Sequence, residues 1–230
     1  MFAAAADTVY FGVFLTLLSY YIGNIIKKKF KSAIFNPLLV SVILILVYIL
    51  ATHTSYEAYN NGAKYISYFM TPATVCFAIP LHQQMKKLKE NKAAILMAII
   101  AGALSSMTSV LVIAVLFGLT HEQYVTLLPK SITSAFGFGV VEELGGISSI
   151  TVPVIILTGA VGNIFGPYLC RIFRIKNRMS VGLAYGSASH ALGTSKALEI
   201  GELEGAMSSL SVVISGLFTV FTASFFAAIY

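Results

Sequence analysis

Long hydrophobic runs alternate with short polar segments along this chain. Six of the runs are long enough to cross a bilayer, because about 20 apolar residues cover a hydrocarbon core of ~30 Å. The predicted spans are residues 8–26, 35–52, 65–85, 93–119, 150–173 and 206–230. Residues 53–62 are predicted to be a polar loop, and Pro72 and Pro80 interrupt the third span. Each span is expected to be a helix, since a helix satisfies its backbone hydrogen bonds within one segment. The pattern therefore predicts an all-α integral membrane protein.

The composition agrees with a membrane protein. Hydrophobic residues make up 57% of the 230 residues, and Asp, Glu, Lys and Arg only 10%, whereas a soluble domain carries about 25% charged residues. This excludes an ordinary soluble enzyme and a disordered chain. The net charge of +6 would favour nucleic acid as the partner of a soluble protein. Here the basic residues form clusters between apolar runs, so we expect a lipid bilayer and no nucleic acid as partner.

The basic clusters also predict the orientation of the spans. Residues 27–31, 86–92 and 171–178 are expected on the cytoplasmic side, because cytoplasmic loops are enriched in Lys and Arg. The N-terminus then lies on the outer side of the membrane. Residues 125–149 must begin and end on the outer side, and residues 179–205 must begin inside and let the last span run outward. Both segments are therefore predicted to be broken or re-entrant.

These two segments suggest an inverted repeat. The fourth span with residues 125–149, and the fifth span with residues 179–205, form similar units of opposite orientation. Many secondary transporters build a substrate site near the bilayer midplane from such repeats and their discontinuous helices. We expect residues 1–63 to be peripheral spans and residues 64–230 to form the core of a single transmembrane domain.

Both broken segments combine hydroxyl groups, a lysine and at least one glutamate. Hydroxyls and free backbone N–H groups at the start of a half-helix favour an anion, and a nearby lysine adds a full positive charge. A small carboxylate is therefore the predicted substrate. The candidate substrate-binding residues are Lys130, Ser131, Thr133, Ser134, Ser187, Ser189, His190, Gly193, Thr194 and Lys196. The candidates for proton or ion coupling are Glu142, Glu143, His190 and Glu199.

Simpler interpretations exist for several of these residues. Lys130 and Lys196 could extend from helix ends so that their ammonium groups reach water. His190 could be a packing histidine, a substrate ligand or a proton carrier. Glu142 and Glu143 could be charges in an outer loop. Glu202 and Glu204 are predicted to be loop charges.

Motifs of common enzymes are absent from the sequence. There is no HExxH, paired CxxC, GxSxG, SxxK or Walker A motif, and the only Asp is Asp7. We therefore expect a protein that is not an enzyme, without catalytic residues, metal or cofactor. The spacings Gly162–Gly166 and Gly182–Gly186 fit the GxxxG pattern that lets two membrane helices pack closely.

Four stretches resemble the LrgB/CidB family of bacterial membrane proteins, which is similar to the C-terminal part of the plant plastid glycolate/glycerate translocator. They are TPATVCFAIPL at residues 71–81, PKSITS at 129–134 with ELGG at 143–146, LTGAVGNIFGP at 157–167, and GSASHALGTSKALEIGELEGA at 186–206. The family pattern has a proline soon after the first hydroxyls, where this chain has Ala135, Phe136 and Gly137.

The resemblance implies two functions. One is transport of small monocarboxylates such as pyruvate, lactate, glycolate or glycerate. The other is antiholin-like control of murein hydrolase export and cell lysis, together with a small LrgA/CidA-type membrane partner. The predicted anion site favours transport as the main hypothesis and leaves the antiholin-like role as the alternative. The charge-free spans also carry more apolar surface than one site needs, so we expect a homodimer.

Overall fold

The computed structural model describes residues 9–30, 37–69, 72, 75–76 and 78–230. Within these residues all regular elements are helices. The chain divides into two compact units, Met1–Cys76 and Phe77–Tyr230. The first unit holds α2 (Val9–Phe30), α3 (Pro37–Thr52) and α4 (Tyr56–Ser67). The second holds α6 (Ala78–Gln83), α7 (Met85–Glu90), α8 (Lys92–Phe117), α9 (His121–Leu127), α10 (Ser134–Leu144), α11 (Ser148–Ile172), α12 (Arg178–Ile200) and α13 (Glu202–Ala227).

In the first unit, α2 packs against both α3 and α4. A side chain at Gly12 would collide with the α4 backbone at Tyr59 and Ala63, so the missing side chain permits the close approach of α2 and α4. One turn further on, the Oγ1 atom of Thr16 lies 2.8 Å from the Oη atom of Tyr59. A small residue and a hydroxyl pair thus join these two helices, as is common between membrane helices.

One prediction for this part of the chain is wrong. Residues 53–62 were expected as a polar loop, but α4 begins at Tyr56, where the Ser55 side chain caps it by accepting a hydrogen bond from the Ala58 N–H at 3.2 Å. A good N-cap offsets the polar composition of this helix. The third span, predicted at residues 65–85 with interruptions at its prolines, lies partly outside the described residues; α4 ends at Ser67 and α6 begins at Ala78. The prolines at 72 and 80 oppose one continuous helix there.

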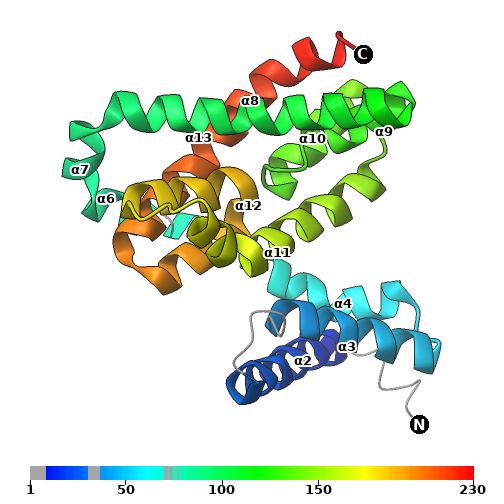
Figure 1. The fold of residues 1–230 in the computed structure, drawn as a ribbon. Coiled ribbons are helices and arrows are strands. Elements are labelled where there is room, and N and C mark those ends of the chain that lie inside the picture. Colours follow the sequence, from blue (N-terminus) through cyan, green and yellow to red (C-terminus); the bar gives the residue numbers. More distant parts are fainter. Residues whose placement is uncertain (1–8, 31–36, 70–71, 73–74, 77) are drawn as a thin grey trace. The chain divides into compact units, whose positions relative to one another are not determined.

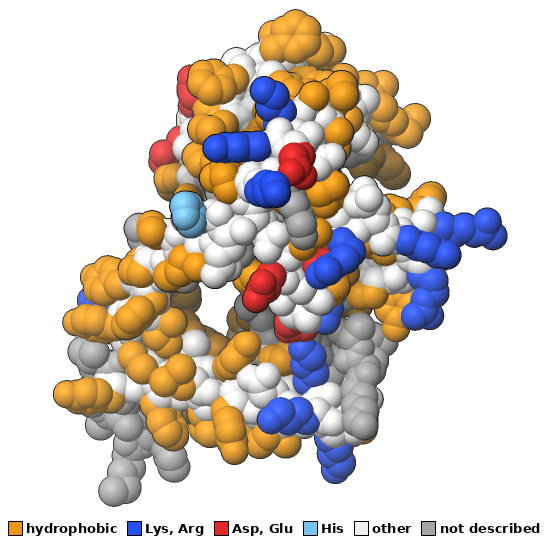
Figure 2. Space-filling view, turned by 90° about the vertical axis from the view of Figure 1, so that its left-hand side faces the viewer, with side chains coloured by type: hydrophobic (Ala, Val, Ile, Leu, Met, Phe, Trp, Pro, Cys, Tyr) orange, Lys and Arg blue, Asp and Glu red, His pale blue; other side chains and the backbone are white. Residues whose placement is uncertain are grey.

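Three of the described helices are long and apolar enough to cross a membrane: α8, α11 and α13. They correspond to the predicted fourth, fifth and sixth spans. In the first unit, residues Val40–Thr52 of α3 form a shorter apolar helix. Large hydrophobic side chains remain exposed on α8, α11 and α13, and Figure 2 shows hydrophobic surface over broad areas of one face. Exposed apolar surface of this extent is what a lipid environment requires.

Helices α8 and α13 pack against each other in the second unit. Near the C-terminal end of α8 they enclose a cluster that includes Met107, Tyr124 and Phe226, to which α9 and α10 also contribute. Near the N-terminal end of α8 a second cluster joins Ile99 to Leu183 of α12 and Met207 of α13. Figure 1 shows α9 and α10 at one end of α8, and α6 and α7 at the other.

Both predicted GxxxG pairs mark close helix crossings. Side chains at Gly182 and Gly186 of α12 would collide with the α13 backbone at Glu204 and Ser208. Side chains at Gly162 and Gly166 of α11 would collide with Ser189 and Tyr185 of α12. The prediction of close packing is therefore confirmed, and α12 lies between α11 and α13 with glycines at both contacts.

Candidate functional site

The first predicted broken segment is interrupted between α9 and α10. Thr120 begins α9 with a capping box: its Oγ1 accepts from the Gln123 N–H at 3.2 Å, and the Gln123 side chain accepts from the Thr120 N–H at 2.9 Å. The helix ends before Pro129, which cannot donate a backbone hydrogen bond. After a short turn α10 runs to Leu144, where Gly145 adopts a φ of 74° that terminates the helix.

The two ends of this segment lie together. The Oγ1 atom of Thr126 accepts a hydrogen bond from the Ile147 N–H at 2.8 Å. The Thr151 hydroxyl donates to the Thr126 carbonyl at 2.9 Å. Residues 126 and 147 are therefore neighbours in space, so the chain enters along α9, turns and returns along α10. We call residues 120–147 the first hairpin.

The second predicted broken segment is interrupted inside α12. His190 has φ 43° and ψ −134°, which separates two helical halves. A side chain at Gly193 would collide with the carbonyl oxygen of Tyr185. Eight residues of continuous helix would extend about 12 Å, so this contact requires the chain to fold back at His190. A positive φ is uncommon for a non-glycine residue and marks a locally constrained backbone.

An ion pair joins the two ends of this second segment. The Arg178 guanidinium at the start of α12 donates to the Glu204 carboxylate of α13 at 2.6 and 2.8 Å. The hydrogen bond to Glu204 and its negative charge raise the pKa of Arg178. The prediction of Glu204 as a loop charge is wrong, because it lies in the first turn of α13 with its side chain 5% exposed. We call residues 178–204 the second hairpin.

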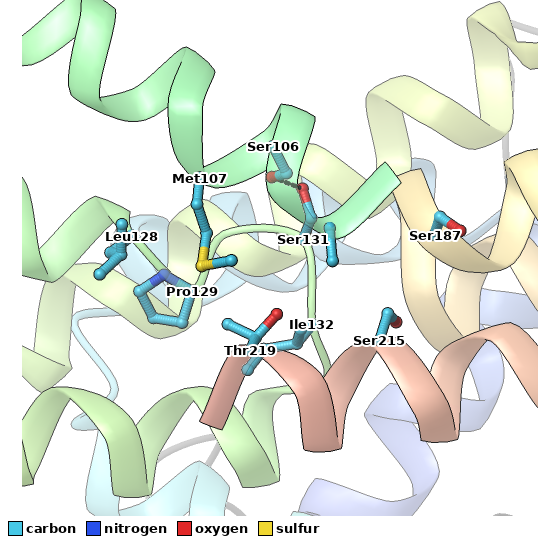
Figure 3. A pocket seen from close by; sticks show the side chains of 10 residues that line it. Ser106, Met107, Leu128, Pro129, Ser131, Ile132, Ser187, Ser215 and Thr219 are labelled. Carbon is cyan, nitrogen blue, oxygen red and sulfur yellow. Dashed lines mark hydrogen bonds between the residues drawn. The ribbon is translucent and has the colours of Figure 1, made fainter. Parts of the chain in front are cut away.

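A small cavity lies where the two hairpins meet α8 and α13 (Figure 3). Ser131 comes from the first hairpin and Ser187 from the second. The Ser106 hydroxyl of α8 donates to Ser131 Oγ at 2.8 Å. The cavity volume of about 10 Å³ is close to the smallest space that holds one water molecule. The structure therefore brings one predicted residue from each hairpin to the same polar cavity.

Lys130 supplies the positive charge beside this cavity. Its Nζ atom donates to Ser106 Oγ and to Ser131 Oγ, each at 3.2 Å. Among the described residues no carboxylate forms an ion pair with Lys130. The lysine is half-buried and has hydroxyl partners only, so its charge is available to an anion.

Ser215 and Thr219 of α13 complete the polar lining, other hydroxyls of α13 pair with the second hairpin, and the sequence interpretation missed both groups. Ser187 Oγ lies 2.6 Å from Ser211 Oγ, and Thr194 Oγ1 lies 2.9 Å from Ser208 Oγ. The buried hydroxyl residues of α13 are Ser208, Ser209, Ser211, Ser215 and Thr219. Four of them, at positions 208, 211, 215 and 219, follow a helical spacing of three and four residues, which was the available signal for one polar face.

Other predicted site residues lie elsewhere. His190 is buried with its Nε2 atom 2.9 Å from the Ile155 carbonyl oxygen, and its ring lies over Gly159 of α11. Lys196 donates to Glu199 at 2.8 Å. Neither residue lines the cavity.

The remaining predicted residues are also outside the cavity lining. Glu142 and Glu143 are exposed on α10. Thr133 precedes α10 without a side-chain capping bond, and Ser134 is the first residue of that helix. Ser189 faces Gly162, and Gly193 packs on the Tyr185 backbone. The described residues contain no group of three or more His, Cys, Asp or Glu that could hold a metal ion.

Comparison with known proteins gives consistent matches. The LrgB-like family model matches residues 16–229. Curated proteins called antiholin-like protein LrgB, from Bacillus mycoides (strain KBAB4), Bacillus cereus (strain B4264) and Bacillus anthracis (strain CDC 684 / NRRL 3495), are each 38% identical over 218 residues. The matched region covers 94% of this chain and 95% of each relative. No solved structure matches.

Proposed function

The chain belongs to the LrgB-like family, and from this premise we propose that it is an antiholin-like protein of a bacterial cytoplasmic membrane. The observation that carries the proposal is the extent of the match. The relatives named antiholin-like align over nearly their whole length and nearly the whole of this chain. The proposed role is to restrain murein hydrolase export and lysis together with a small LrgA/CidA-type membrane protein, without catalysis.

The antiholin-like role is now the main proposal, whereas the sequence alone favoured transport. The comparisons favour the antiholin-like alternative, because the relatives carry that name. The small cavity points the same way, since about 10 Å³ admits one water and no three-carbon acid. A carrier would have to open this site before binding its substrate.

Monocarboxylate transport is retained as a second candidate function because of one observation. Lys130 has only hydroxyl partners, Ser106 and Ser131, beside a cavity to which both hairpins contribute. A carboxylate there would accept charge-assisted hydrogen bonds, which are stronger than bonds between neutral groups. It would also neutralise a lysine that is costly to hold within a membrane protein.

A lysis assay tests the antiholin-like proposal. Removing the gene from its bacterium is expected to speed detergent-induced autolysis and to increase murein hydrolase activity in the medium. Expression of the chain should restore the slower rate, and this restoration should require the small membrane partner. An autolysis rate that is the same with and without the gene would contradict the proposal.

Liposome flux tests the second candidate. Purified protein alone should take up labelled pyruvate or glycolate with saturation, and Lys130→Met should lower the uptake at least tenfold. Lys196→Met is the matched control, because Lys196 is paired with Glu199 away from the cavity. Absence of saturable uptake by the wild-type protein would exclude transport by the chain alone.

An inverted arrangement of the two hairpins underlies both candidates, with the N-terminus outside. Single cysteines at Glu143 of the first hairpin and Arg174 beside the second, placed in a chain without its own cysteines, test it. A membrane-impermeant thiol reagent should label the first from outside and the second only from inside. Labelling of both positions from one side would contradict the inverted repeat.

We further propose a homodimer, which the exposed apolar surface of α8 supports. Leu104, Val112, Ile113 and Leu116 are all exposed in the single chain. Native mass spectrometry in a mild detergent should detect a dimer, and Val112→Asp should shift it to monomer. A wild-type protein that is entirely monomeric would count against the homodimer.

A further inference from the structure

A second cavity, distinct from the one beside Lys130, lies between α11 and the first half of α12. Its volume is about 110 Å³. The lining is mostly apolar and includes Leu169, Ile175 and Ala188. An apolar cavity of about 150 Å³ can hold a small ring such as benzene, so this space suits a short hydrocarbon segment. Leu169 is 49% exposed, and the cavity therefore reaches the surface of a helix long and apolar enough to span a membrane.

One polar atom of this cavity has no partner. The Tyr185 hydroxyl is buried and makes no hydrogen bond within the described residues. The whole side chain is only 3% exposed, and its ring and hydroxyl lie over Gly166 of α11. A buried hydroxyl without a partner costs free energy, and each such group in a native structure calls for an explanation. Tyr185 lines the cavity, so a ligand in the cavity could accept this hydrogen bond.

A positively charged turn lies directly beside the cavity. Helix α11 ends in a tight turn in which the Ile175 N–H donates to the Cys170 carbonyl at 2.8 Å, with Arg174 at φ 54°. Cys170 and Ile175 both line the cavity. Their sequence neighbours Arg171, Arg174 and Lys176 are exposed, and no carboxylate pairs with any of them in the described part of the chain.

We propose that this cavity binds one acyl chain of an anionic phospholipid. The chain would fill the apolar space, an ester carbonyl would accept the Tyr185 hydrogen bond, and the phosphate would lie at Arg171, Arg174 and Lys176. Three features support one ligand with this order of groups, because the charged turn, the hydroxyl and the apolar lining are contiguous. Basic pockets at the cytoplasmic ends of membrane helices are suited to anionic headgroups. The proposal does not depend on the function proposed above.

Native mass spectrometry with added lipid tests the site. Dioleoylphosphatidylglycerol should bind the wild-type protein more tightly than dioleoylphosphatidylcholine, and free glycerol phosphate should not compete. Tyr185→Phe keeps the ring and removes the hydroxyl, so it should weaken phosphatidylglycerol binding about three- to tenfold. Tyr168→Phe is the matched control, because Tyr168 lies near the end of α11 but is 52% exposed and does not line the cavity. Ala188→Leu should abolish binding by filling the cavity.

Thermal unfolding followed by circular dichroism gives a second readout, in which Tyr185→Phe should act differently without and with lipid. Without lipid, Tyr185→Phe should unfold at the same or a higher temperature than the wild type, because the variant no longer buries an unpaired hydroxyl. Added phosphatidylglycerol should raise the unfolding temperature of the wild type more than that of the variant. Equal effects of Tyr185→Phe and Tyr168→Phe, or equal binding of the two lipids by the wild type, would overturn the proposal.

Discussion

The two hairpins reverse the direction of the chain by different physical means. The first reverses through the turn between α9 and α10 and is closed at its base by neutral hydrogen bonds that Thr126 accepts from Ile147 and Thr151. The second reverses at the single residue His190 and is closed by the ion pair of Arg178 and Glu204.

This difference explains which hairpin carries a charged side chain at its tip. A turn of several residues has room for a charged side chain at its tip, and Lys130 occupies that position beside Ser131. A reversal at one residue brings two helical halves into contact, so its tip consists of packed groups such as Gly193 against Tyr185. The first hairpin thus supplies the charge of the candidate site, and the second supplies neutral hydroxyls.

The largest expected effect comes from the tight reversal. Gly193→Ala should lower the free energy of unfolding by ~3 kcal/mol or more, because its Cβ would collide with the Tyr185 carbonyl and the backbone cannot relax easily. Gly139→Ala in α10 of the first hairpin is the control, since its Cβ would meet no atom within 4 Å. It should leave stability unchanged or raise it by up to ~1 kcal/mol. Thermal unfolding in detergent measures both, and equal effects would contradict the tight reversal.

The closing ion pair should have the next largest effect. Arg178→Glu places a second carboxylate beside buried Glu204 and should lower the unfolding temperature less than Gly193→Ala does. The Arg178 side chain is 61% exposed, but Glu204 is buried, so removing the guanidinium leaves a buried carboxylate without compensation. The double variant Arg178→Glu with Glu204→Arg should recover part of the loss. Failure of the double variant to recover any stability would show that the pair does not close this hairpin.

The neutral closure of the first hairpin should contribute less. Thr126→Val keeps the shape of the side chain and leaves the Ile147 N–H without its acceptor, which should cost ~1–3 kcal/mol of the free energy of unfolding. Thr108→Val on the exposed side of α8 is the matched control and should change stability by less than ~0.5 kcal/mol. Similar losses for the two variants would mean that Thr126 does not hold the base together.

The smallest effect is expected at Lys196. Its pair with Glu199 is local, at positions i and i+3, with side chains 26% and 53% exposed. Partly exposed pairs contribute ~0.2–1 kcal/mol, so Lys196→Met should change the free energy of unfolding by no more than that. A much larger loss in the free energy of unfolding would contradict a purely local role for Lys196.

Much of the second unit was predictable from the sequence because its signals are local. Hydropathy predicted α8, α11 and α13, and the charge clusters predicted that residues 125–149 and 179–205 are interrupted. The GxxxG spacings predicted close crossings, since the absence of a side chain acts directly on the distance between helices. The loop predicted at 53–62 failed because one capping residue, Ser55, determined the local structure more than composition did.

The candidate site was predictable only in part, because contacts between distant residues decide it. Ser131 and Ser187 share the cavity because α8 and α13 bring them together, and the sequence does not show that His190 is used for the reversal. Likewise, the sequence around Glu204 is typical of a charged loop. Only the hydrogen bond of Glu204 to Arg178, 26 residues earlier, shows that it closes the second hairpin.

The serine face of α13 has a consequence for synthesis in the cell. Ser187 and Thr194 have their hydroxyl partners, Ser211 and Ser208, on a helix that is made after them. Ser208 and Ser211 follow Glu204, the end of the second hairpin, by only four and seven residues. At a translation rate of about 5–20 residues per second they are made within ~0.2–1.4 s of it. The first hairpin is completed on a similar schedule, because Thr151 follows Ile147 by four residues. Each hairpin therefore receives its closing partners from the first turns of the helix that follows it, so the two halves of the core are completed in the order in which they are translated.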